Sequence, residues 1–196
     1  MLVGAPMMSA KTPTCRPQRW LWLVLCASVA PLLADQRIFT NPKPEGHFKT
    51  VMPAAVAFSP LGGTPLHWKA YAVDPATHRG AEPVGYIFWT TDLAPDEFAY
   101  HGPIHILVGL DTKGIITGAV VDYHSDPYGY FSVEPAEWAA QFKGKSVFDR
   151  FVVGADIDAI SRASISVKSG TRAVRDSVRA AARAFLNPEL VKRPGP

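Results

Sequence analysis

The sequence predicts an α+β fold, in which a small antiparallel sheet packs against one long C-terminal helix. Two patterns indicate it. Residues 104–110 and 115–123 are β-branched, apolar runs joined by Asp111-Thr112-Lys113-Gly114, which is typical of a β-hairpin with glycine at the turn position that needs a positive φ. Residues 164–186 carry apolar side chains at helical spacing and are followed by Asn187-Pro188, which predicts a long amphipathic helix that ends there.

Shorter patterns predict the elements before the hairpin. Residues 47–58 could form a short helix interrupted near Pro53, because proline lacks the amide hydrogen that a helix interior needs. Residues 68–73 alternate weakly, as in a strand. Residues 84–91 are rich in aromatic and β-branched side chains and also predict a strand, which Thr90 and Thr91 would close.

After the hairpin, residues 125–135 predict a loop that carries proline, glycine and aromatic rings. Residues 135–142 suit a short helix with proline in its first turn. Residues 147–153 predict one further strand. The helix over 164–186 should bury Val167, Val174, Val178 and Phe185 on one face.

The first 34 residues resemble a leader. Three basic residues (Lys11, Arg16 and Arg19) precede an apolar run over 20–34. This run of fifteen residues suits an export signal better than a membrane span, which needs about 20. Cleavage after Ala34 and retention as a membrane anchor both remain open. The chain is thus divided into a leader (1–34), an extension with the first strands (35–99), a domain core (100–186) and a tail (187–196).

Charge and cysteine content exclude several functions. The net charge of +3 comes from the leader, so the rest of the chain holds 17 basic against 17 acidic residues and has no electrostatic footprint for nucleic acid. Both cysteines, Cys15 and Cys26, lie in the leader. Disulfides, cysteine-ligated iron–sulfur clusters and thiol catalysis are therefore not expected after residue 34.

A hydroxyl-rich segment leads into the C-terminal helix. It runs Asp158-Ala159-Ile160-Ser161-Arg162-Ala163-Ser164-Ile165-Ser166, and Ser169 follows. A helix start carries unpaired N–H groups and a positive dipole end, so it attracts phosphate. A hydroxyl there can also anchor a phosphate-bearing cofactor. The alternative is a serine cap on an ordinary surface helix.

The segment resembles the Asp-x-x-Ser-Gly-Ala-Thr motif of FMN-binding domains, which occur in NosR/NirI-type regulators and in subunits of Na⁺-translocating quinone reductases and Rnf complexes. Asp158, Ser161 and Ala163 match this motif. Ser164 stands at the threonine whose hydroxyl an ApbE-type flavin transferase joins to the FMN phosphate. Arg162 replaces a glycine that would permit a positive φ, but its guanidinium could bind phosphate.

The resemblance extends over residues 100–186. Residues 101–111 resemble the family's Gly-x-Pro-Ile strand, and residues 113–118 its following turn and strand. His124-Ser125-Asp126-Pro127 is similar to the family's His-x-Glu-Pro. His124 could hydrogen-bond the backbone with Asp126 or face the isoalloxazine. The nearby rings could stack on a flavin or fill the core; they are Tyr123, Tyr128, Tyr130 and Phe131.

Two further patterns could indicate a function. Four arginines recur at helical spacing and would form one stripe along the C-terminal helix: Arg172, Arg175, Arg179 and Arg183. This stripe is either a solvated face or a docking surface for a partner or acidic lipid. Three histidines, His101, His105 and His124, have no cysteine neighbours. His101 and His105 flank Gly102-Pro103 and a strand start rather than lying on a helix, so they need not converge and no metal site is expected.

The resemblance implies an exported FMN-binding protein that carries electrons, on the periplasmic side or on the periplasmic face of the inner membrane, rather than an independent enzyme. Ser164 would hold FMN by an ester or hold its phosphate non-covalently. Ser161 and Ser166 would support the loop, and Asp158 would cap or orient it. The implied partners are the flavin transferase and a membrane-associated redox complex.

Two alternatives stay open. In the first, Arg162 has abolished flavin loading, and the chain is an interaction module that docks on a membrane complex through the arginine stripe. In the second, the chain is a non-covalent flavin reductase that uses a soluble donor.

Overall fold

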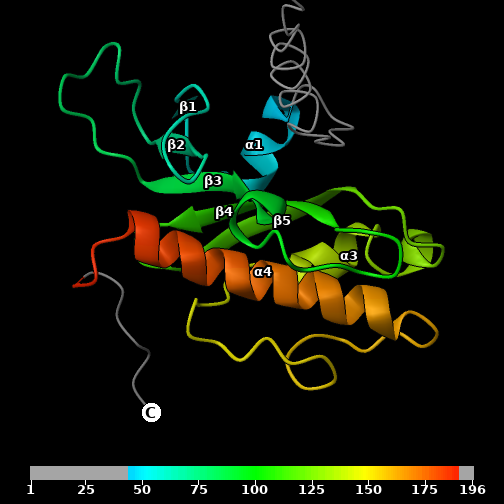
Figure 1. The fold of residues 1–196 in the computed structure, drawn as a ribbon. Helices are drawn as coiled ribbons and strands as arrows, with labels where there is room; N and C mark the ends of the chain where they lie inside the picture. Colours follow the sequence, from blue (N-terminus) through cyan, green and yellow to red (C-terminus); the bar gives the residue numbers. More distant parts are fainter. Residues whose placement is uncertain (1–43, 190–196) are drawn as a thin grey trace, which may run out of the picture. The chain divides into compact units, whose positions relative to one another are not determined.

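A computed structural model describes residues 44–189, which contain one five-stranded antiparallel sheet (Figure 1). The strands lie in chain order across the sheet, each hydrogen-bonded to the next. They are β1 (Ala57–Phe58), β2 (Trp68–Tyr71), β3 (Gly85–Trp89), β4 (His105–Asp111) and β5 (Ile116–Tyr123). The predicted hairpin is confirmed as β4 and β5, and Gly114 in its turn has a φ of 81°. The leader expected over residues 1–34 lies outside the described residues.

Helices cover both faces of this sheet. They are α1 (Glu45–Val51), α2 (Thr90–Leu93), α3 (Ala136–Ala140) and α4 (Ser164–Phe185), and a 3₁₀ helix, η2, spans Gly129–Phe131. Figure 1 shows α4 running along one face, with α1 over the opposite face. The predicted α+β class and the long C-terminal helix are confirmed. Between residues 44 and 189, no helix is long and apolar enough to cross a membrane.

Strand β4 is buried on both of its faces. Ile106, Val108 and Leu110 belong to the core that includes Val167, Val174 and Val178 of α4. Leu107, between them, points to a second core with Phe48 and Val51 of α1. Alternate residues of a strand face opposite sides, so burial on both sides explains why β4 reads as a continuous apolar run. Phe185 is only partly buried and packs at the edge of the α4 core.

Two paired glycines allow α1 to lie directly on the sheet. Gly109 of β4 is opposite Gly118 of β5. A Cβ atom on Gly109 would lie 2.3 Å from the Val51 carbonyl oxygen, and one on Gly118 would lie 2.8 Å from the Thr50 carbonyl oxygen. Close backbone approach of this kind requires glycine. Helix α1 and strands β1, β2 and β3 all come from the segment before residue 100.

The strand predicted over residues 147–153 is wrong. This segment is an irregular loop whose Val153 makes one isolated bridge, to Ile157. Side chains satisfy several of its backbone hydrogen-bonding groups. The Asp156 carboxylate accepts hydrogen bonds from the N–H groups of Phe151 and Val152. Arg179 donates to the carbonyls of Val147 and Asp149. These bonds replace the ladder that the β-branched residues would otherwise favour.

Two element boundaries also differ from prediction. Helix α1 begins at Glu45 and ends at Val51, before Pro53, while Phe58 belongs to β1. Thr90 does not end a strand but begins α2. Its buried hydroxyl accepts the Ile106 N–H at 3.2 Å, which joins α2 to β4 and explains the early end of β3.

Candidate functional site

The N-terminus of α4 has no side-chain cap. Ala163 precedes the helix and Ser164 is its first residue. The first helical bond runs from the Val167 N–H to the Ala163 carbonyl, at 3.0 Å. The N–H groups of residues 164–166 therefore have no carbonyl of an earlier helical turn to bond. No serine caps the helix, so that alternative is wrong, and Asp158 does not cap the helix either; orientation of the loop by Asp158 stays a prediction.

A pocket of about 500 Å³ opens at this helix terminus. Three chain segments form it: the loop before β4, the loop after β5, and the start of α4. Its lining residues are Tyr100, Pro127, Tyr128, Arg162, Ala163, Ser164, Ile165 and Ser166. Four of the predicted site residues (Arg162, Ala163, Ser164 and Ser166) thus meet in one place. The exposed hydroxyl-bearing residue Ser164 lies among them.

A buried carboxylate holds the three segments together. Asp126 is 5% exposed and accepts hydrogen bonds from the Ser166 hydroxyl at 2.5 Å and the His101 N–H at 3.0 Å. The Ser125 hydroxyl adds a bond to the His101 carbonyl, at 2.9 Å. Ser166 therefore joins the start of α4 to the loop after β5, while its predicted support of the motif loop stays a prediction. Because buried polar groups are costly when unpaired, this network restrains the pocket walls.

Arg162 adopts the backbone conformation that the glycine of the motif would permit. Its φ is 67°, in the left-handed region that disfavours residues with a Cβ. The side chain is exposed at the pocket and makes no hydrogen bond or ion pair with any residue from 44 to 189. The pocket therefore has one cationic group, next to the uncapped helix start.

Exposed rings stand beside these polar groups. Tyr100 is 63% exposed and Tyr128 is 52% exposed, and both line the pocket. The other rings of the predicted cluster lie elsewhere: Tyr123 packs against His105, and Phe131 packs against the core. Tyr130 is exposed and contacts Phe131. Aromatic faces at a pocket edge can stack on a planar ligand.

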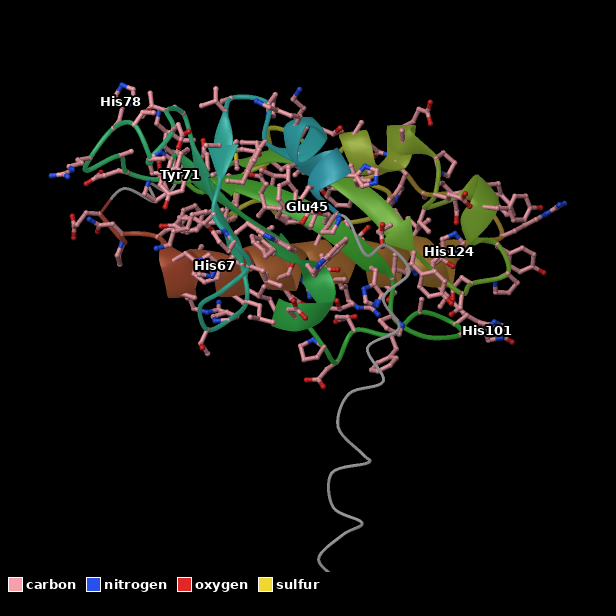
Figure 2. The ribbon with its side chains drawn as sticks, turned by 90° about the horizontal axis from the view of Figure 1, so that it is seen from above. Glu45, His67, Tyr71, His78, His101 and His124 are labelled. Carbon is pink, nitrogen blue, oxygen red and sulfur yellow. The ribbon has the colours of Figure 1, made fainter. Side chains whose placement is uncertain are left out.

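Three predicted residues lie outside the pocket lining. Ser161 and Asp158 are exposed, and the Asp158 backbone N–H bonds the Gln141 side chain at 2.8 Å. His124 packs so closely on Gly129 that a Cβ there would lie 2.2 Å from the ring. Its Nε2 is 3.3 Å from a Glu134 carboxylate oxygen. Figure 2 shows His124 and His101 at the same end of the sheet. Contact of His124 with a flavin stays a prediction.

Most of the arginine stripe is engaged within the chain. Arg172 pairs with Glu97 at 2.9 Å, and Arg175 pairs with the adjacent Asp176 at 2.7 Å. Arg179 donates to two backbone carbonyls, as described above. Arg183 is exposed. The predicted stripe is therefore not a uniformly solvated face.

Sequence reasoning missed three lining residues, Tyr100, Pro127 and Ile165, and the part played by Asp126. Pro127 and Asp126 lie within the segment that resembles His-x-Glu-Pro, so that resemblance was the available signal. Tyr100 has no comparable signal, because only the fold brings it beside α4. Within the described part of the chain, no three His, Cys, Asp or Glu side chains are grouped to hold a metal ion.

Free N–H groups, a hydroxyl, a guanidinium and two rings meet in this pocket, and these are the kinds of group that a phosphate-bearing aromatic ligand requires. Residues 99–179 match the model of the FMN-binding domain family, and this segment is an FMN-binding domain. FMN is accordingly the cofactor indicated for the chain. The match runs from before β4 into α4 and includes every residue that lines the pocket. A search of curated proteins found none that matches the chain.

Proposed function

We propose that the chain is an exported electron-transfer flavoprotein whose FMN is held in the pocket at Ser164. One observation carries this proposal: Ser164 is exposed, lines the pocket and begins α4 without a cap, all within the FMN-binding segment. The donor set fits FMN, because the phosphate needs N–H, hydroxyl or guanidinium donors and the ring system needs aromatic contacts.

Each part of the pocket has a distinct task in this proposal. The N–H groups of residues 164–166 and the Ser164 hydroxyl bind the phosphate. Tyr100 and Tyr128 hold the flavin ring and exclude water from one side of it. Asp126 positions the two loops against α4. FMN, when bound, supplies the transfer of electrons, and the surrounding side chains set its position and environment.

Covalent attachment would join the Ser164 hydroxyl oxygen to the flavin phosphorus: the hydroxyl loses its proton, and the phosphoanhydride bond of an activated flavin nucleotide supplied to the transferase breaks, so that its other phosphate leaves. Serine provides the same oxygen nucleophile as the threonine of the family motif, and an exposed residue is accessible to an ApbE-type flavin transferase. The same hydroxyl can instead hydrogen-bond the phosphate without a covalent bond. Ser164→Ala removes both possibilities, and denaturation separates them because only an ester retains the flavin.

The proposed export and the proposed partners are supported by the sequence. The leader-like residues 1–34 support a location in the periplasm or on the periplasmic face of the inner membrane, where a membrane-associated redox complex of the NosR/NirI type would exchange electrons with the flavin. The alternative of a flavin-free docking module is less favoured, because Arg172, Arg175 and Arg179 already have partners within the chain.

The test is the intact mass and visible absorbance of the chain after export with an ApbE-type transferase. A mass increase matching an FMN phosphoester, absent in Ser164→Ala, supports covalent attachment. Ser161→Ala is the matched control, because Ser161 is exposed nearby but does not line the pocket. Flavin that is lost in denaturant indicates non-covalent binding. A colourless, unmodified chain refutes the proposal and favours the docking module.

A further inference from the structure

Two non-glycine residues between 44 and 189 have a positive φ, and only one of them is explained by its packing. Phe151 has a φ of 54°, but this residue is 3% exposed within the α4 core, and its N–H donates to the Asp156 carboxylate. Arg162 has a φ of 67°, yet its side chain is exposed and has no partner among the described residues. Nothing in its own contacts offsets this disfavoured conformation.

The position of Arg162 supplies a reason for its presence. It is the one charged residue among the eight that line the pocket. It lies two positions before Ser164, at the end of α4 that has no side-chain cap. Lys168, one turn further along the helix, is exposed but does not line the pocket. The positive charge within the pocket therefore comes from Arg162 and the helix start.

We infer that Arg162 is a specificity-determining residue that makes the pocket select a flavin bearing a terminal phosphate over the same flavin without it. The guanidinium contributes charge-assisted hydrogen bonds that riboflavin cannot accept. The contact of Arg162 with the phosphate offsets the conformational cost of the left-handed backbone at this residue. This inference rests on the proposed function, because it concerns the same pocket.

The experiment compares FMN with riboflavin. The chain is purified from cells without a flavin transferase, and the dissociation constants of both flavins are measured by fluorescence quenching at low salt. Four proteins are compared: the natural chain, Arg162→Gly, Arg162→Lys and Arg183→Gln. Arg183 is the matched control, because it is an exposed arginine in the last turn of the same helix. The Tm of each protein without ligand is measured in parallel.

The natural chain is expected to prefer FMN. Arg162→Gly should reduce the ratio of FMN to riboflavin affinity by about tenfold or more, the range of a charge-assisted hydrogen bond. It should also raise the Tm, by roughly 1–4 °C, because glycine accepts the left-handed conformation. Arg162→Lys should retain part of the preference, and Arg183→Gln should retain all of it.

Three results would overturn the inference: an unchanged affinity ratio in Arg162→Gly, a natural chain with no preference for FMN, or a lower Tm in Arg162→Gly, which would make the arginine structural. Each of these leaves the proposed function intact if the transferase still loads the chain with flavin. A chain that acquires flavin by neither route instead refutes the proposed function itself.

Discussion

Replacing Asp126 by alanine should loosen the pocket more than any change to an exposed lining residue. The carboxylate is 5% exposed and is the acceptor for both the Ser166 hydroxyl and the His101 N–H. A hydrogen bond to a charged group contributes about 1.5–3 kcal/mol. His101 is near the surface, where water can replace the lost acceptor, so we expect a total loss of about 2–4 kcal/mol in the free energy of unfolding.

Urea unfolding followed by circular dichroism measures this loss, and the Tm should fall by roughly 4–12 °C. Ser166→Ala removes one of the two bonds and should cost less than Asp126→Ala. The double variant should cost less than the sum of the single variants, because the two residues share a bond. The reasoning is refuted if Asp126→Ala unfolds within about 0.5 kcal/mol of the natural chain, the range of an ordinary surface substitution.

Two further predictions concern the sheet. Gly109→Ala should lower the free energy of unfolding by about 1–3 kcal/mol, because its Cβ would lie 2.3 Å from the Val51 carbonyl oxygen of α1. Gly46→Ala is the control within α1, where a Cβ meets nothing within 4 Å, and should be neutral or stabilising; equal losses in urea unfolding would contradict the close approach. Burial lowers the pKa of His105 and outweighs the opposing effect of Asp122 and Asp92, so the folded chain protonates less readily than the unfolded one. The free energy of unfolding should therefore fall as the pH decreases below about 6.5, and His105→Gln should reduce this fall; identical pH profiles would argue against it.

The hairpin and α4 could be predicted because their signals are local. The turn at residues 111–114 contains the glycine that a positive φ requires, and the apolar spacing along α4 repeats over 22 helical residues. The strand predicted over 147–153 failed because the Asp156 carboxylate and Arg179 satisfy its backbone instead. The sequence pattern contains no information on which side chains will approach a segment from elsewhere in the fold.

The candidate site was likewise predicted only in part. The motif from Asp158 to Ser166 pointed to the helix start, and the structure places Arg162, Ala163, Ser164 and Ser166 in one pocket there. The motif also suggested a cap by Asp158, which does not form. Tyr100 could not be assigned, because its place in the pocket depends on bonds between distant segments, among them those of His101 with Ser125 and Asp126.

The sequence by itself determined the α+β class, the hairpin, the long helix and the hydroxyl-rich segment that leads into this helix, because each depends on the spacing or chemistry of neighbouring residues. Tertiary structure alone decided that α1 covers the second face of the sheet, that two loops and the start of α4 form a pocket, and that Asp126 joins these three segments. It also decided that Arg162 holds a left-handed backbone. These features depend on contacts between distant segments, and such contacts form only when the whole core packs.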